Sequence, residues 1–153
     1  MKKIALSFAL VASLVTVAAA DRSAAAPNPT LAEIQKALGF VPDFIKNVPA
    51  PLLPGFWASV TGLEMNPATK LDGKTKELIG LAVAAQIPCD YCIYFHTEAA
   101  RLNGATDDEL KEAIGMAALT RMGSTIHNGN QVDKAQFKRD VQRILDGAKH
   151  AKK

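Results

Sequence analysis

Two cysteines and a histidine lie close together in the segment Cys89-Asp-Tyr-Cys92-Ile-Tyr-Phe-His96. On an α-helix, residues three and four positions apart share one face, so both sulfurs and the imidazole are predicted to lie within reach of each other. A helix N-terminus stabilises a thiolate, and a nearby imidazole can accept the thiol proton. Two cysteines at this spacing can also close a disulfide, so a sulfenic acid on one can be resolved by the other. The segment therefore indicates redox or nucleophilic chemistry.

A carboxylate is predicted to complete this group of residues. Glu77 lies twelve residues before Cys89 in a strongly apolar stretch, where an ionised side chain is costly unless it has a partner. A turn at Ile87-Pro88 folds this stretch back against the segment with the cysteines, so His96 is the expected partner. A Glu77–His96 pair would orient the ring and let it relay protons. The alternative is that Glu77 lies in an exposed first turn, where it only favours the helix dipole.

Helices separated by proline and glycine must position these residues, because no alternating β pattern occurs anywhere in the chain. Thr30 and Glu33 have the spacing of a capping box that opens a short helix, and Thr106 and Glu109 have it again. Helices are expected at 30–39, 56–65, 70–86, 89–102, from 106 onward, and from 133 onward. The predicted fold is all-α, and the helices that carry Glu77 and the cysteines pack as a hairpin.

The last two predicted helices carry apolar stripes that we expect to be buried. The first stripe consists of Leu110, Ala113, Ile114, Ala117 and Ala118. The second consists of Phe137, Val141, Ile144 and Leu145.

The N-terminus has the pattern of a secretory signal peptide. Two lysines precede an apolar run over 4–17, and Ala18-Ala-Ala20 offers small residues for cleavage. The run is shorter than the roughly 20 apolar residues of a membrane span. We expect cleavage near Ala20, a periplasmic or secreted product, and no stable membrane insertion after cleavage. The expected organisation is a signal peptide at 1–20, a linker at 21–29, a helical domain at 30–149 and a basic tail at 150–153.

Composition narrows the possible functions. The 153 residues suffice for one domain with a core, and two cysteines are too few for a disulfide scaffold or a four-cysteine zinc site. The net charge is +3, and removal of residues 1–20 takes away two lysines and leaves +1. The remaining basic residues near the C-terminus alternate with aspartates and have almost no aromatic neighbours, which argues against nucleic-acid binding.

Taken together, these motifs resemble the AhpD-like alkylhydroperoxidase branch of the carboxymuconolactone decarboxylase superfamily. The resemblance covers about residues 38–130 and rests on Lys76-Glu77-Leu-Ile79, Cys89-x-x-Cys92, His96, Ala100-x-x-x-Gly104 and Glu109-x-x-Glu112-Ala113. It implies an AhpD-like helical bundle that assembles into homotrimers or homohexamers. It also implies that the domain at 30–149 reduces hydroperoxides through its CxxC pair, as an antioxidant enzyme.

The resemblance also implies a role for each site residue. Cys92 would attack the peroxide and become the sulfenic acid, Cys89 would resolve it, and His96 with Glu77 would relay protons. The redox-active disulfide would take the place of a cofactor, with no bound metal. The expected partners are a small peroxide and a thiol reductant protein. Tyr91 departs from the family, because the best-known peroxidase has a histidine just before its second cysteine.

Three alternatives for the same residues remain open. A periplasmic thiol–disulfide oxidoreductase without peroxidase turnover is the main one, because an oxidising compartment lacks an obvious reductant for the pair. A structural Cys89–Cys92 disulfide would not need His96, and so short a loop adds little chain-entropy stabilisation. Cys89, Cys92 and His96 offer three zinc ligands, but on one helical stripe they make an awkward tetrahedron.

Overall fold

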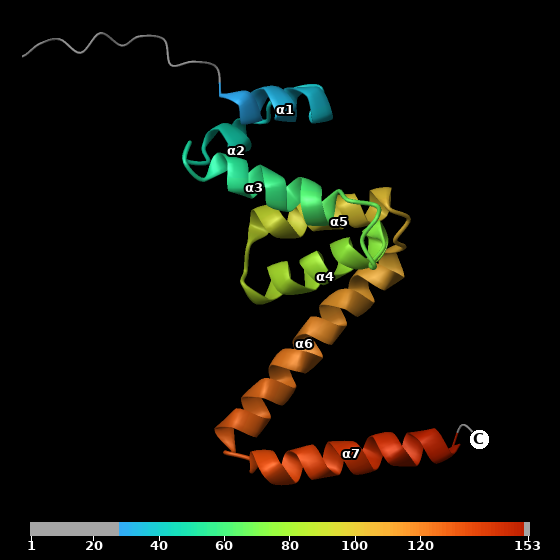
Figure 1. The fold of residues 1–153 in the computed structure, drawn as a ribbon. Helices are drawn as coiled ribbons and strands as arrows, with labels where there is room; N and C mark the ends of the chain where they lie inside the picture. Colours follow the sequence, from blue (N-terminus) through green and yellow to red (C-terminus); the bar gives the residue numbers. More distant parts are fainter. Residues whose placement is uncertain (1–27, 152–153) are drawn as a thin grey trace, which may run out of the picture. The chain divides into compact units, whose positions relative to one another are not determined.

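The computed structural model describes residues 28–151, which form seven α-helices and one π-helical turn and contain no strand (Figure 1). The predicted all-α class is confirmed. The predicted signal peptide, most of the linker and the last two residues of the basic tail lie outside the described residues. No helix within 28–151 is both long enough and apolar enough to cross a membrane. The chain divides after Pro54 into two compact units.

The first unit contains α1 (Pro29–Leu38) and α2 (Asp43–Lys46). Asn28 caps α1, and its side chain accepts a hydrogen bond of 3.0 Å from the backbone N–H of Thr30. The predicted capping box at Thr30 and Glu33 is therefore wrong, and Thr30 is buried inside the helix. The helix begins earlier because Pro29 suits the first helical position, where its missing N–H costs nothing.

A π-helical turn interrupts the segment that we expected to be one regular helix at 56–65. The helix α3 (Leu53–Ser59) runs directly into the turn η1 (Val60–Glu64). Lys76, in the next helix, links that helix to the end of this turn. Its Nζ donates hydrogen bonds to the backbone carbonyls of Leu63, Glu64 and Asn66 at 2.9, 3.3 and 2.8 Å. These carbonyls lie where a helix ends and need donors from outside the helix.

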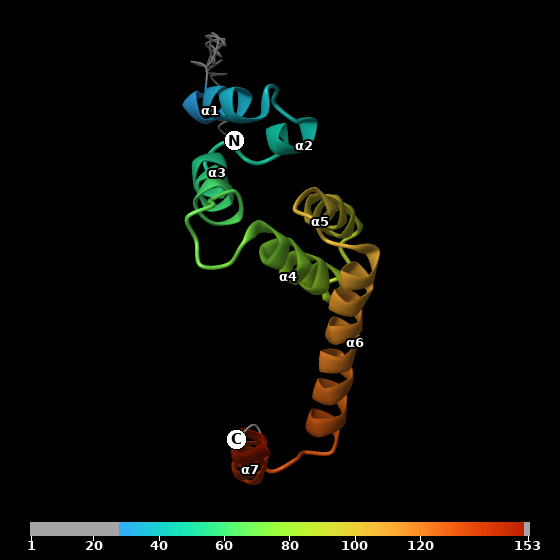
Figure 2. The ribbon, with the colours of Figure 1, turned by 90° about the vertical axis from the view of Figure 1, so that its right-hand side faces the viewer.

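The helices α4 (Gly73–Gln86) and α5 (Asp90–Leu102) form the predicted hairpin and lie side by side in both views (Figures 1 and 2). Asp72 caps α4 by accepting a 2.7 Å hydrogen bond from the backbone N–H of Thr75. Gly104 follows α5 in the left-handed conformation, with φ of 86°, as expected for a glycine after a helix end.

The helix α6 (Asp107–Gly129) packs against both arms of the hairpin, most extensively against α4. The predicted capping box at its start is present, with Thr106 and Glu109 exchanging hydrogen bonds of 3.2 and 2.7 Å. The shared core contains Leu81, Ala100 and Leu110, with Leu78, Ile93 and Ala105 packed against it. The Lys74–Glu109 ion pair of 2.7 Å joins the starts of α4 and α6.

The predicted burial of the last apolar stripes is wrong for this chain by itself. The final helix α7 (Lys134–Ala151) leaves Phe137, Val141, Ile144 and Leu145 exposed. On α6, Leu110 and Ala117 are buried, whereas Ile114 and Ala118 are exposed. The stripes have helical periodicity, but the described residues leave most of the stripe on α7 uncovered, and His127 of α6 lies against Phe137 with ring centroids 5.4 Å apart.

Candidate active site

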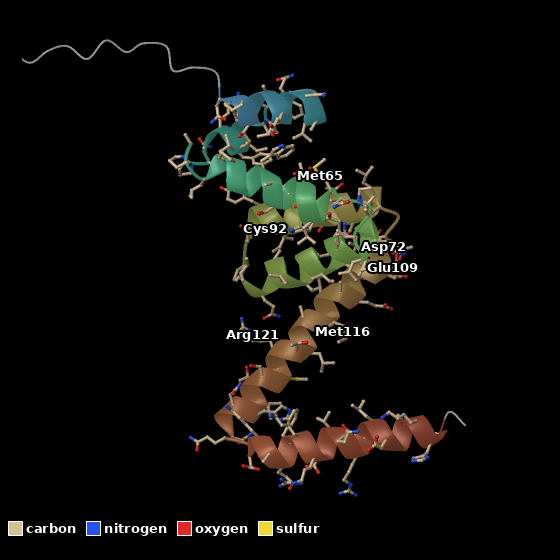
Figure 3. All side chains as sticks on the ribbon, in the orientation of Figure 1. Met65, Asp72, Cys92, Glu109, Met116 and Arg121 are labelled. Atoms are coloured by element: carbon tan, nitrogen blue, oxygen red, sulfur yellow. A yellow bond between two sulfur atoms is a disulfide. The ribbon has the colours of Figure 1, made fainter. Side chains whose placement is uncertain are left out.

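The two cysteines mark the start of α5. Cys89 is the N-cap, and its Sγ accepts a hydrogen bond of 3.2 Å from the backbone N–H of Cys92. The two sulfurs form a disulfide, and the two Cα atoms are 5.2 Å apart. Figure 3 places Cys92 toward the turn of the hairpin, at the opposite end from Asp72 and Glu109. The disulfide therefore lies at the positive end of the α5 dipole, where a thiolate is stabilised after reduction.

Glu77 and His96 form the predicted pair across the hairpin. Glu77 Oε2 on α4 is 2.7 Å from His96 Nδ1 on α5. The glutamate is only 5% exposed, so the alternative of a solvated first-turn carboxylate is wrong. With Glu77 ionised, the Nδ1–H donates to its carboxylate, which fixes the ring and leaves Nε2 able to accept a proton.

Gly80 lets the imidazole lie directly against α4. A Cβ atom at this position would be 2.5 Å from His96 Cε1 and Nδ1, and 2.8 Å from Cγ. These atoms belong to the Nδ1 side of the ring, so the Nε2 edge is turned away from the α4 backbone. Gly80 was not among the predicted site residues, because the sequence does not show which helical glycine a neighbouring ring will approach.

The imidazole and the disulfide share one face of α5. His96 follows Cys92 by four residues, the spacing that makes side chains neighbours on a helix surface. Both residues are partly exposed, whereas the Glu77 carboxylate behind them is buried. A reduced Cys92 would therefore have a base beside it, and that base is held by a buried acid.

Glu64 is a further polar residue of the site, and it was not predicted from the sequence. The candidate ligand atoms of Glu64, Glu77 and His96 all lie within 4.8 Å of one another. Glu64 Oε1 is buried and has no hydrogen-bond partner among the described residues. Burial raises the pKa of the Glu64 carboxyl, and the nearby Glu77 carboxylate raises it further, against smaller opposing effects of His96 and Lys76. The only signal in the sequence was a single glutamate in an otherwise apolar segment.

The zinc site considered from the sequence does not form in this oxidised chain, because the disulfide occupies both sulfurs. Two carboxylates and an imidazole can in general hold a divalent cation, so the cluster of Glu64, Glu77 and His96 is the donor set to consider instead.

Two exposed tyrosines lie close to the cysteines in the sequence. Tyr91 is 90% exposed and Tyr94 is 72% exposed. Tyr91 stands where the best-known peroxidase of the family that the sequence resembles has a histidine, and in this chain it is directed into solvent.

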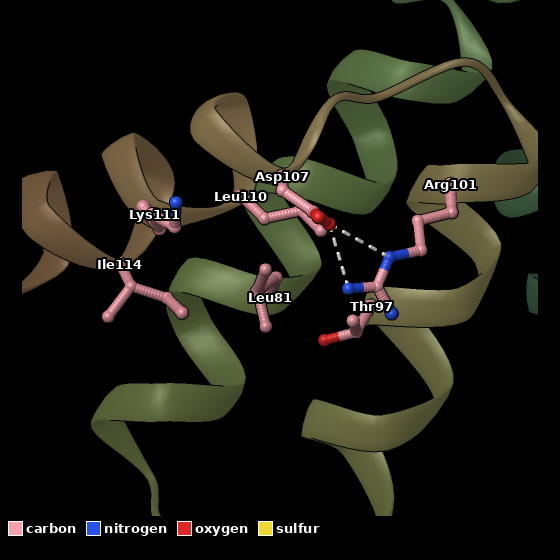
Figure 4. A pocket seen from close by; sticks show the side chains of 7 residues that line it. All are labelled: Leu81, Thr97, Arg101, Asp107, Leu110, Lys111 and Ile114. Atoms are coloured by element: carbon pink, nitrogen blue, oxygen red, sulfur yellow. Dashed lines mark hydrogen bonds and ion pairs between the residues drawn. The ribbon is translucent and has the colours of Figure 1, made fainter.

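A hollow of about 330 Å³ lies elsewhere on the same unit, between α4, α5 and α6 (Figure 4). It is lined by Leu81, Thr97, Arg101, Asp107, Leu110, Lys111 and Ile114. Across it, Arg101 donates to Asp107 Oδ1 from Nε and Nη2, at 3.3 and 2.9 Å. Because its lining contains neither cysteine, nor His96, nor Glu77, this hollow is separate from the site around the disulfide.

The fold and the site together define a class of protein: a helical domain with a CxxC disulfide at a helix start, a histidine on the same helix, and a buried glutamate on the adjoining helix that pairs with this histidine. The chain belongs to the carboxymuconolactone decarboxylase family, whose sequence profile matches residues 51–132. Its fold is similar to the crystal structure of the alkylhydroperoxidase AhpD core from Rhodospirillum rubrum, with a TM-score of 0.61 and 28% identity. That match covers 71% of this chain and 84% of the other, and it confirms the predicted AhpD-like fold.

A curated relative from Paracoccus denitrificans, described as uncharacterized protein 4 in cox locus, is 43% identical over 61 residues. The match covers 40% of this chain and 55% of the relative. The chain thus spans about half the length of that relative.

Proposed function

We propose that this protein is a thiol-dependent hydroperoxide reductase that uses Cys89 and Cys92 as its redox pair. The observation that carries the proposal is the 2.7 Å hydrogen bond between His96 and the buried Glu77, one helical turn from the disulfide. A disulfide that only stapled the chain would not need an oriented base beside it. The similarity to an alkylhydroperoxidase core structure supports the same chemistry.

In the first step, reduced Cys92 attacks the peroxide. His96 Nε2 accepts the thiol proton, and the imidazolium that forms is stabilised by Glu77 through Nδ1. The thiolate sulfur then bonds to the distal peroxide oxygen as the O–O bond breaks. The leaving alkoxide takes a proton from the relay and departs as an alcohol, and Cys92 is left as a sulfenic acid.

In the second step, Cys89 resolves the sulfenic acid. As the N-cap of α5, its thiolate is stabilised by the helix N-terminus and by the N–H of Cys92, which already contacts this sulfur. The Cys89 thiolate attacks Cys92 Sγ, the S–S bond forms, and hydroxide leaves with a proton as water. A dithiol reductant then supplies two electrons and two protons and becomes a disulfide itself.

We propose that the protein acts as a homo-oligomer, a trimer or a hexamer. The exposed apolar stripe of α7, at Phe137, Val141, Ile144 and Leu145, supports an interface between copies. On α6, Met116, Leu119, Met122 and Ile126 extend the exposed apolar surface.

We also propose a periplasmic or secreted location, which rests on the signal-peptide pattern of residues 1–20. This location requires an electron donor outside the cytosol, because an oxidising compartment favours the disulfide form. The electron donor is therefore a dedicated periplasmic thiol protein, which reduces the disulfide after each turnover.

Thiol–disulfide exchange without peroxide turnover is the second candidate. The partial exposure of Cys92 and the exposure of Tyr91 between the two cysteines favour it, because a protein substrate must approach the disulfide closely. The two candidates differ in what oxidises the pair: a peroxide in the first, and a protein disulfide in the second.

The deciding experiment uses the mature chain with an added dithiol and an organic hydroperoxide. We expect peroxide consumption by the native protein and its loss in Cys92→Ser. In Cys89→Ser we expect one turnover that ends in a sulfenic acid, trapped by dimedone and detected by mass spectrometry. A peroxide rate that is unchanged in Cys92→Ser, or reduction of insulin disulfides without any peroxide consumption, would reject the peroxidase assignment.

A further inference from the structure

Glu64 places a second carboxylate beside the Glu77–His96 pair. Its ligand atom lies within 4.8 Å of the ligand atoms of both partners, and Oε1 is buried without a hydrogen bond. The Lys76 ammonium group donates to the backbone carbonyl of Glu64 and not to the buried Oε1 atom. A buried carboxylate oxygen without a hydrogen-bond donor is costly, so Glu64 favours taking up a proton.

The proposed reaction moves two protons in each turnover, so a second proton-accepting group in the site could take part in it. Each turnover removes a proton from each of two thiols, and returns one to the leaving alkoxide and one to the leaving hydroxide. His96 Nε2 can hold one of these protons, while Nδ1 is committed to Glu77. A second acceptor close to the imidazole would keep both protons inside the site.

We propose, resting on the proposed function, that Glu64 is the second proton-holding group of this relay and supplies the proton that leaves with hydroxide when Cys89 closes the disulfide. Glu64 acts through His96 and Glu77 and is thus a positioning residue of the relay. The raised pKa of its carboxyl brings proton exchange closer to neutral pH.

The charges that face Glu64 favour a proton over a metal ion. From α4 it faces Glu77 and Lys76, and from α5 it faces His96. Lys76 Nζ donates to the backbone carbonyl of Glu64 itself, so an ammonium group already lies beside the cluster. A divalent cation would be repelled by this ammonium group. The same group also opposes protonation of Glu64, but less strongly than burial and the Glu77 carboxylate favour it.

The first test compares the two chemical steps in the mature, dithiol-reduced protein. In Glu64→Gln we expect sulfenic-acid formation, measured in the Cys89→Ser background, to stay within about twofold of the parent. We expect disulfide closure in single turnover to slow on the order of tenfold, which is modest for loss of acid–base assistance. Glu64→Asp should recover part of the closure rate, and the exposed Glu112→Gln is the matched control. Equal closure rates in Glu64→Gln and the parent would overturn the proposal.

The second test needs no peroxide. A carboxyl with a raised pKa stabilises the folded state at acid pH, and this stabilisation is lost as the pH rises through the folded-state pKa. Glu64→Gln should therefore raise the Tm by roughly 2–4 °C at pH 8 and leave it unchanged at pH 4. Glu112→Gln should show no such pH dependence. The same Tm difference at both pH values would overturn proton holding by Glu64.

The two tests separate this proposal from the proposed function. If the native protein consumes no peroxide, the function fails, and the pH dependence of the Tm still decides whether Glu64 holds a proton. Titration with Zn²⁺ alone adds a further outcome. Tight binding that Glu64→Gln abolishes would make the cluster a metal site and overturn the proton assignment.

Discussion

The hairpin of α4 and α5 differs from the final helix, α7, in how far its apolar side chains are buried and its buried acid is paired. In the hairpin, Leu81 and Ala100 are fully buried, and the one buried acid, Glu77, has a partner at 2.7 Å. On α7 the apolar stripe is exposed, with Ile144 70% accessible. One chain thus builds its candidate site from two adjoining helices, whereas its last helix presents an apolar surface suited to another molecule.

The largest expected effect comes from the core behind the site. Leu81→Ala removes a side chain with 0% exposure, and we expect the free energy of unfolding to fall by about 2–5 kcal/mol. Urea denaturation followed by circular dichroism measures this change. Leu102→Ala, at a position that is 89% exposed, is the control and should stay within about 0.5 kcal/mol of the parent. Equal losses would mean that the hairpin core is not the main source of stability.

A methyl group on Gly80 should damage the site and the packing together. The new Cβ would press on the His96 ring, so we expect a loss of about 1–3 kcal/mol in unfolding free energy. The displaced imidazole should also move the pH midpoint of thiol alkylation upward, toward that of a free cysteine. Gly115→Ala on α6 meets no atom within 4 Å and should leave the alkylation profile unchanged. An unshifted alkylation profile in Gly80→Ala would show that His96 does not act on the cysteines.

Polar substitutions on α7 test whether its exposed apolar stripe forms an interface between copies of the chain. In Ile144→Ser with Leu145→Ser we expect a smaller particle mass by light scattering, because the proposed interface loses apolar area. The thiol alkylation profile should stay that of the parent, since the site residues all lie on η1, α4 and α5. An unchanged mass would place the interface elsewhere or show that the protein is a monomer.

The sequence predicted a contact of the site best where a single turn and the burial of a single residue decide it. The hairpin turn at Ile87-Pro88 and the cost of a buried carboxylate together predicted the Glu77–His96 pair, and the structure confirms it. Glu64 was not predicted, because its position depends on the π-helical turn η1. The apolar spacing of residues 56–65 is that of an ordinary α-helix and does not indicate the extra residue per turn.

Long-range packing accounts for the exposure of the stripe on α7. The stripe on α7 has the periodicity of a buried face, but periodicity says nothing about whether the same chain or another molecule covers it. The predicted start of α1 is wrong for a local reason, because two N-cap candidates, Asn28 and Thr30, lie within three residues. Asn28 is the N-cap in the structure, and Pro29 after it suits the first helical position.

The smallest expected effect concerns the ion pair that joins α4 to α6. The hydrogen bond from Lys74 lowers the pKa of the Glu109 carboxyl, so the pair stabilises the folded state at neutral pH and loses this effect as the pH falls through the folded-state pKa. Lys74→Gln should therefore lower the Tm slightly at pH 7, and the difference should vanish near pH 3. Lys111→Gln, which breaks a more exposed pair with Asp108, should change the Tm less. A Tm loss in Lys74→Gln that persists at pH 3 would show that the lysine acts through packing of its stem against the hairpin rather than through its charge.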